Sequence, residues 1–532
     1  MARKHNIPLR SWAPRWVGIV ITFFIMISVM LLNGTYTAAS LDISGSLGVL
    51  SEDISMVYYA ASIGMVVAFP IIGKIRAIAT TKTITLSVLI LLTFLAYVCA
   101  RTSNTNILIL CNFLMGFLRA FMMVEMTLIL RPFFSKNESQ SEFYSYFYPI
   151  SFGLGQISMI ITAALAYQYQ WQHMYYLIIG LQVLTITLIL VFFRYGRKPI
   201  RIPFRDIDWI SVGAITLIYL FIVYVCIYGR TNDWLDSKQI LTLTLVIPFI
   251  IWFFLRRQRA SDIPYLKIEV LLRPKNFLAY FFTGIAMFFN ASETLISQYT
   301  TVVLRMDSVH SNELNLWMIP GFIIAGGICY WWFNAQIWRL RVLVFWAMAC
   351  FVVYFAFIYF GLRPDGRFEF LYLPYILKGT GLMILLIVFS VYAVEGLDRK
   401  LRLHNAFFKI GVRSILAAAL SSCLFSNLFY HLQIQHQMIL GEGLDMQNSL
   451  FASRFSQSVN SALSQGYSLS EAQQMATRVM HNSVQIQSTM LSIKQITGYL
   501  LILSFVIMVV VRFIPFHKTL KFIVPKTGDD MV

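Results

Sequence analysis

Continuous apolar blocks of about twenty residues recur along this chain, and they constrain its fold more than any other feature. One of them, "ILILCNFLMGFLRAFMMVEMTLIL", covers residues 107–130. A bilayer core about 30 Å thick requires roughly 20 apolar residues in each helix that crosses it. Only helices and closed barrels satisfy their backbone hydrogen bonds in lipid, and barrel strands alternate between apolar and polar residues. The sequence therefore predicts an all-α membrane protein, in agreement with 58% hydrophobic and only 12% charged residues.

Fourteen such blocks are predicted to span the membrane as helices. The predicted spans are residues 16–40, 54–75, 83–100, 106–130, 143–166, 174–194, 209–228, 239–255, 276–299, 313–333, 342–361, 370–395, 405–430 and 495–514. The basic N-terminal segment runs into the first block without a small-residue cleavage site. That block is therefore expected to be retained as the first span rather than removed as a signal peptide.

The connections between the blocks differ in charge on the two predicted sides of the membrane. Most of the 42 lysine and arginine residues fall in the connections of one side, together with both terminal segments. Positively charged connections remain in the cytoplasm, so both termini are predicted to be cytoplasmic. The net charge of +18 thus reflects orientation in the membrane. Because the basic residues form no single patch, nucleic acid is not an expected partner.

The longest polar connection covers residues 431–494 and is predicted to lie outside the membrane. It is rich in Gln and Ser, and Ser468 and Glu471 have the spacing of a helix-capping box. Partly helical structure is therefore expected in this loop. The loop is a candidate docking surface for a periplasmic adaptor protein, and a long connection without any partner is an equal alternative.

A weak internal repeat relates span 1 to span 9 and span 4 to span 12, so the related spans are eight spans apart. "LLNGTYTAAS" resembles "FFNASETLIS" and aligns Asn33 with Asn290, while "NFLMGFLRAF" resembles "PYILKGTGLM" and aligns Gly116 with Gly379. This offset predicts two six-helix bundles separated by an inserted helix pair. The expected divisions are residues 1–200 for the first bundle, 201–260 for the inserted pair and 261–532 for the second bundle. A parallel repeat of this kind is typical of major-facilitator transporters.

Several motifs carry a closer resemblance to a known family. "NFLMG" keeps Gly116 of a span 4 signature and has Asn112 in its arginine place, and "WQHMYYLIIG" and "IPYLKIEVLLRPKNF" fit later motifs. The chain resembles the major facilitator superfamily, and within it the fourteen-helix drug:proton antiporters of the EmrB/QacA type. The resemblance implies proton-coupled multidrug efflux, with the proton as coupling ion, and a bacterial inner membrane as the location.

Three family motifs are altered in this chain. The loop "GKIRAIATTK" keeps Gly73 and Lys82 but has Ala77 in the aspartate place, and "SMIITA" stands where the antiporter motif of span 5 is expected. Asn33 replaces the acidic residue of span 1. The resemblance therefore implies the architecture and a conformational role for Gly73, Lys82, Gly116 and Gly379 more directly than it implies proton antiport.

Ionisable residues inside predicted spans are costly in lipid and usually face a partner or a water-filled cavity. Arg119 lies near the middle of its span, seven residues after Asn112 and on the same helical face. Glu125 points about 240° around the helix from Arg119, so these two side chains are predicted to be separate sites. Arg119 is a candidate substrate contact, or else an arginine paired with a neighbouring helix. Glu125 is the first candidate for a proton carrier.

The second half contributes a further set of charged candidates. Lys378 is the predicted counterpart of Arg119, and the two are expected to line one central cavity from opposite bundles. Glu293 is the second candidate for a proton carrier because it follows Asn290 in the repeat. Arg413 is a candidate site residue at intermediate depth, whereas Lys409 is expected to extend toward the membrane surface. Since deep cations outnumber deep carboxylates, such a site would suit an amphipathic anion.

The sequence contains no recognisable catalytic grouping, phosphate-binding loop or metal-ligand spacing, so no enzyme activity, metal or cofactor is expected. The main hypothesis is a secondary transporter that moves a small amphipathic solute or drug by alternating access, with proton-coupled export. The alternative within transport is an importer or facilitator of organic anions. The alternative from another class is a membrane receptor or scaffold that has lost transport.

Overall fold

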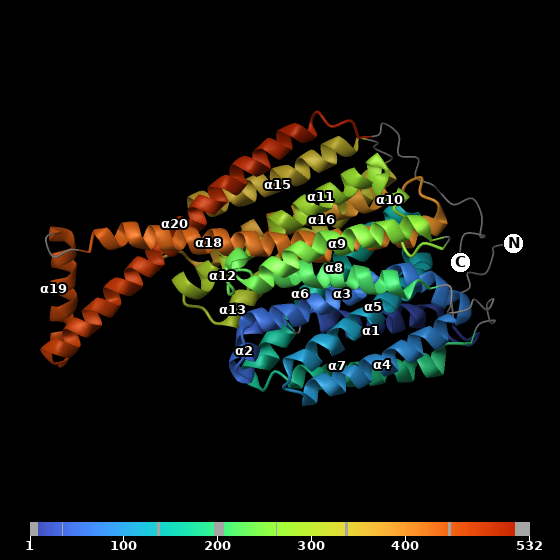
Figure 1. Cartoon of the computed structure of the whole chain (residues 1–532), viewed down its shortest axis with the longest axis horizontal. Coiled ribbons are helices and arrows are strands. Elements are labelled where there is room, and N and C mark those ends of the chain that lie inside the picture. The colour runs from blue at the N-terminus through green and yellow to red at the C-terminus, as the bar shows by residue number, and fades with distance from the viewer. Residues whose placement is uncertain are drawn as a thin grey trace.

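The computed structural model describes residues 9–34, 36–135, 139–195, 207–261, 263–335, 339–444 and 448–516. Within these ranges the elements of secondary structure are helices, apart from one isolated β-bridge between Leu9 and Phe193. Most helices lie nearly parallel in one elongated bundle (Figure 1). The prediction of an all-α protein is confirmed.

The described residues of the first part of the chain, up to Ala260, form helices α1 to α9. They are α1 (Arg15–Gly34), α2 (Ser40–Leu47), α3 (Ser51–Ile78), α4 (Thr81–Arg101), α5 (Thr105–Phe134), α6 (Gln140–Gln168), α7 (His173–Phe192), α8 (Trp209–Tyr228) and α9 (Lys238–Ala260). Helices α8 and α9 correspond to the predicted inserted pair. They pack against each other, and an ion pair of 2.9 Å between Asp208 and Arg257 joins them.

The second part continues with α10 to α20 and two π-helical turns. They are α10 (Glu269–Leu272), α11 (Pro274–Asn290), α12 (Glu293–Gln298), η3 (Tyr299–Val303), α13 (Ser308–Glu313), α14 (Met318–Asn334), α15 (Leu340–Gly361), α16 (Tyr372–Val394), α17 (Arg402–Gly411), η7 (Val412–Leu416), α18 (Ala417–Glu442), α19 (Ser449–Ser464) and α20 (Leu469–Val511).

Every predicted span coincides with helical structure. Within the described residues, 12 helical segments are long and apolar enough to cross a membrane. The other two predicted spans, 16–40 and 276–299, coincide with α1 and α11, which are not among these 12 segments. A total of fourteen crossings stays a prediction.

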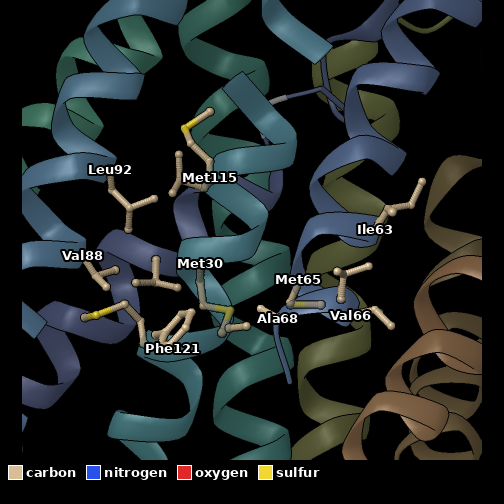
Figure 2. Close-up of a cluster of buried hydrophobic side chains, with 14 of the residues drawn as sticks. Met30, Ile63, Met65, Val66, Ala68, Val88, Leu92, Met115 and Phe121 are labelled. Carbon is tan, nitrogen blue, oxygen red and sulfur yellow. The ribbon is translucent and has the colours of Figure 1, made fainter. Parts of the chain in front are cut away.

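Two large apolar clusters form the core, one in each half of the chain. The first gathers side chains between Leu9 and Leu266 together with three from α17, η7 and α18, and the second gathers side chains from Ala279 to Phe516. Figure 2 shows part of the first cluster, in which Met30, Val66 and Phe121 come from three different helices. Because α17 and its continuation contribute to the first cluster, they lie between the two halves.

Glycines hold equivalent helix crossings tightly together in the two halves. A Cβ atom on Gly116 would lie 1.8 Å from the carbonyl oxygen of Ala61, so α5 and α3 touch through their backbones. In the second half a Cβ on Gly379 would lie 2.7 Å from the carbonyl oxygen of Met318, where α16 crosses α14. Small residues permit this close approach in membranes. The aligned glycines of the sequence repeat therefore occupy matching crossings.

A helical hairpin projects from one end of the bundle (Figure 1). It consists of the outer ends of α18 and α20 with α19 between them, and it corresponds to the predicted loop 431–494. The capping box is confirmed, because the Ser468 hydroxyl accepts from the Glu471 backbone N–H and the Glu471 carboxylate accepts from that of Ser468. The prediction of partly helical structure is confirmed.

The predicted orientation can be tested by labelling single cysteines in a background without the six native ones. A cysteine at Ser464, at the tip of the hairpin, is expected to react with a membrane-impermeant maleimide added outside intact cells. A cysteine at Lys400, in the exposed connection before α17, is expected to react only after the membrane is opened. Both positions reacting from the same side would contradict the predicted topology.

Candidate functional site

Charged residues from both halves meet around Tyr58, which α3 places at the boundary between the halves. The charges of Arg119, Arg413 and Glu293 all act on the Tyr58 hydroxyl. Arg119 comes from α5 in the first half, whereas Arg413 in η7 and Glu293 in α12 belong to the second half. The structure thus brings three of the predicted site residues into one region. A common cavity lined by Arg119 and Lys378 stays a prediction.

Lys378 and Glu293 form an ion pair in the second half, with 3.2 Å between Nζ and Oε2. The Lys378 side chain is fully buried in α16, while the Glu293 side chain is 32% exposed. Glu293 follows a break between α11 and α12 at Ala291 and Ser292, where the helix does not continue. Just before this break, the Oδ1 atom of Asn290 is buried without a hydrogen-bond partner among the described residues. The ion pair therefore sits beside an interrupted helix.

Lys409 links the two halves through hydroxyl groups. Its ammonium in α17 donates a 2.7 Å hydrogen bond to the Tyr148 hydroxyl of α6 and another to the Ser390 hydroxyl of α16. The residue is only 7% exposed. The expectation that Lys409 extends toward the membrane surface is wrong, because Tyr148 and Ser390 bind its ammonium inside the protein.

Three aromatic side chains of α6 face the cations of α17 and η7. Tyr144, Tyr148 and Phe152 are spaced four residues apart and therefore share one helical face. Lys409 Nζ lies 5.1 Å from the centre of the Tyr148 ring, and the Arg413 guanidinium lies 5.4 Å from the centre of the Phe152 ring. All three rings are half-buried. We call Tyr144, Tyr148 and Phe152 the α6 aromatic stripe.

Glu125 is held apart from this region by a partner of its own. Its Oε1 accepts a 2.7 Å hydrogen bond from Nε of Arg76, at the end of α3. The Glu125 side chain is 2% exposed and that of Arg76 is 28% exposed. No direct bond joins Glu125 to Arg119 within the described residues, as the 240° separation on the helix predicts. The pair connects α3 and α5 within the first half.

Asn112 belongs to a different polar cluster. Its amide donates to the hydroxyl of Tyr36 at 3.3 Å, and Tyr36 shares a 2.5 Å hydrogen bond with Tyr175. This cluster joins α5 and α7 to the segment after α1. The backbone of Asn33 ends α1 nearby in the chain, but its side chain lies outside the described residues. A substrate role for either asparagine stays a prediction.

Two residues of the altered loop motif make contacts that hold helices together. Lys82 is 3% exposed and donates to the backbone carbonyls of Leu190 and Phe193, at the C-terminal end of α7. A cation there complements the helix dipole. A Cβ on Gly73 would lie 3.1 Å from Leu403 of α17, so this glycine meets the second half. A conformational role for both stays a prediction.

Several residues of the site were not predicted from the sequence. Tyr58, Tyr148 and Ser390 lie beside the buried charges but have no unusual sequence context. Arg76 belongs to the loop motif "GKIRAIATTK", but nothing in that motif indicates that it pairs with Glu125. The four-residue spacing of the α6 aromatic stripe was a usable signal. This spacing indicates a binding surface only when the cations opposite it are known, and those cations lie more than 250 residues further along the chain.

Comparison with known proteins places this architecture in a family. Residues 19–422 match the model of the Major Facilitator Superfamily. The chain belongs to this superfamily. It is accordingly a multi-pass membrane transporter rather than an enzyme, and the resemblance seen in the sequence is confirmed at this level.

One curated relative is the "Colistin resistance protein EmrB" of Acinetobacter baumannii, which is 24% identical over 311 residues. The match covers 57% of this chain and 58% of that relative's length. Among solved structures, the nucleoside transporter NupG aligns with a TM-score of 0.50 at 11% identity, covering 94% of this chain and 100% of NupG. The human organic anion transporter MFSD10 aligns with a TM-score of 0.49 at 11% identity, covering 92% of this chain and 100% of that protein. At such identities, the NupG likeness concerns the fold alone.

Proposed function

We propose that this superfamily member is an alternating-access secondary transporter that exports a small amphipathic solute in exchange for protons. The observation that carries the proposal is the cluster of ionisable groups around Tyr58, to which both halves contribute. Ionisable side chains inside a membrane are costly and therefore mark transport pathways. When two bundles rock around such a site, its groups become accessible from each side in turn.

The geometry favours Glu293 over Glu125 as the proton carrier. The Arg76 guanidinium binds Glu125 in a 2.7 Å ion pair, and the Glu125 side chain is only 2% exposed. Glu293 is more accessible, pairs with Lys378, acts electrostatically on Tyr58 of the first half, and follows the break after α11. Protonation of Glu293 would release Lys378 and change the charge at the boundary between the halves. We therefore assign coupling to Glu293 and a structural role to Glu125.

The test is flux in proteoliposomes that contain the purified full chain, measured with labelled amphipathic acids, bases and neutral solutes. Parent protein is expected to concentrate at least one class of solute when a pH gradient is imposed. Glu293→Gln should reduce gradient-driven accumulation at least about 10-fold while equal-pH exchange is retained. Glu369→Gln, which removes an exposed external carboxylate, is the matched control and should behave as the parent.

Each outcome separates the hypotheses. Loss of gradient-driven accumulation in Glu125→Gln but not in Glu293→Gln would return the coupling role to Glu125. No flux of any solute class would contradict transport and favour a receptor or scaffold. Accumulation toward the compartment opposite to export would favour the second candidate, uptake of an organic anion. That candidate is supported by the excess of buried cations, since Lys409 and Arg413 have no carboxylate partner among the described residues.

A further inference from the structure

We propose that Lys409, Arg413 and the α6 aromatic stripe form a binding subsite for an aromatic carboxylate that bridges the two halves of the protein. This inference names the substrate class of the proposed transporter and therefore rests on the proposed function. The ligand's carboxylate would bind the Lys409 ammonium and the neighbouring hydroxyls. Its ring would pack against the α6 aromatic stripe.

The charge of Lys409 provides the first argument. An ammonium has three hydrogen-bond donors and no acceptor. Two of these donors bind the hydroxyls of Tyr148 and Ser390, neither of which is a carboxylate. The described part of the chain places no carboxylate within ion-pair distance of Lys409. A buried charge without a counter-charge is costly, so an anionic ligand would relieve that cost.

The second cation extends the positive region along α6. Arg413 follows Lys409 by four residues and stands over Phe152, one turn along from Tyr148. No carboxylate among the described residues pairs with Arg413 either. A guanidinium offers a planar pair of donors that matches a carboxylate. A ligand anion between the two cations could therefore contact both.

The α6 aromatic stripe supplies the apolar part of the subsite. The Tyr148 ring lies 5.5 Å from that of Tyr144 and 6.1 Å from that of Phe152, centre to centre. These three rings lie at the boundary between the two halves, and each of them is only half-buried. Aromatic faces attract both aromatic ligands and the cations that stand over them. A flat apolar group carrying one negative charge fits this combination better than a cation, which Lys409 and Arg413 would repel.

The position of the subsite gives it a role in transport. The stripe belongs to α6 of the first half, and the cations belong to α17 and η7 of the second half. A ligand held by both halves contacts them differently when they move apart. Differential binding of this kind is what allows a solute to shift the balance between conformations. The subsite is thus distinct from the Lys378–Glu293 pair, to which we assign the proton.

The experiment measures binding of three matched probes to the full chain in lipid nanodiscs by equilibrium dialysis. The probes are naphthoate, its neutral amide and naphthylmethylamine, which is positively charged at neutral pH. Naphthoate is expected to bind at least about 10-fold more tightly than the amide, the gain typical of a hydrogen bond to a charged group. Lys409→Gln should weaken naphthoate binding about 10- to 100-fold with little effect on the amide. Lys409→Arg should stay within a few-fold of the parent.

Controls separate the subsite from general effects on folding. Lys400→Gln removes an exposed lysine close to α17 and should leave binding of all three probes unchanged. Phe152→Leu keeps apolar volume but removes the ring, and it should weaken naphthoate and amide equally. Size-exclusion profiles and melting temperatures show whether each variant is folded. If Lys409→Gln does not fold, the contrast between the three probes in parent protein and in Phe152→Leu still decides the question.

The proposal is overturned if parent protein binds the amine or the amide as tightly as naphthoate, binds none of the probes, or keeps its affinity in Lys409→Gln. The failure of the proposed function is recognised separately. Charge-selective binding without counterflow of naphthoate in proteoliposomes would leave the subsite standing and reject transport. Gradient-driven flux of other solutes without selectivity for the carboxylate would reject the subsite and leave the proposed transport function standing.

Discussion

Replacing Gly116 by alanine is expected to destabilise the folded protein by about 1–3 kcal/mol or more, the range seen when atoms are forced into a packed core. The added methyl group would lie 1.8 Å from the carbonyl oxygen of Ala61. A backbone atom cannot rotate away as a side chain can, so α5 and α3 would have to separate. On the facing helix, a Cβ atom on Gly64 would lie 2.0 Å from the carbonyl oxygen of Phe113, so neither helix has room for a side chain at this crossing.

The measurement is the melting temperature of purified protein in detergent, together with the yield of monodisperse material. Gly321→Ala should give a similar loss, because a Cβ there would lie 2.3 Å from the carbonyl oxygen of Ile376 in the equivalent crossing of the second half. Gly180→Ala is the matched control, since it lies in α7 with no atom within 4 Å of the added group. Alanine favours helix over glycine, so the control should be neutral or slightly stabilising. Equal melting temperatures for Gly116→Ala and Gly180→Ala would contradict the proposed role of the crossing.

Replacing Lys378 by methionine is expected to abolish gradient-driven transport, with a residual rate below about 1% of the parent. The side chain is fully buried and bound to Glu293 at 3.2 Å, so its removal leaves a carboxylate without its counter-charge. Breaking a buried ion pair in this way typically costs about 3–5 kcal/mol. The cost would be lower here, because Glu293 is 32% exposed and is partly screened.

The double variant Lys378→Met with Glu293→Gln distinguishes folding from function. It removes both charges, so folding yield should recover to within about two-fold of the parent, since replacing a whole pair is often near neutral. Gradient-driven flux should stay absent because no proton carrier remains. Lys275→Met is the control, since its partner Glu395 is 3.4 Å away and Lys275 is 34% exposed. A double variant that still concentrates solute would remove this pair from the coupling mechanism.

The positions of the helices could be predicted because the membrane imposes a simple rule on the sequence. Apolar blocks must be long enough to cross, and the capping pattern at Ser468 marks the start of α20 directly. The repeat could be read because Gly116 and Gly379 are local solutions to the same close crossing. Such features depend on neighbours along one helix or on a single contact between two helices.

The partners of the buried charges could not be predicted in the same way. Depth in a span indicates that a charge is costly, but it does not say which side chain compensates it. The sequence predicts a proton carrier at Glu125 and an extension toward the membrane surface at Lys409, but it identifies the partner of neither charge. One is neutralised by Arg76 on the adjacent α3, and the other faces hydroxyls from two other helices. Only the folding of distant segments onto each other separates these cases.

Helix α20 connects the helical bundle to the projecting hairpin. Helix α20 runs for 43 residues without a proline, so at 1.5 Å per residue it is about 64 Å long, roughly twice the thickness of the hydrocarbon core. Its outer half carries α19, while its inner half packs on α15. Because a continuous helix behaves as a rod, a tilt of about 10° about its midpoint would carry the outer end sideways by roughly 6 Å. Movement of the bundle would thus be transmitted outward as displacement of the hairpin, far from the helices that cross the membrane region.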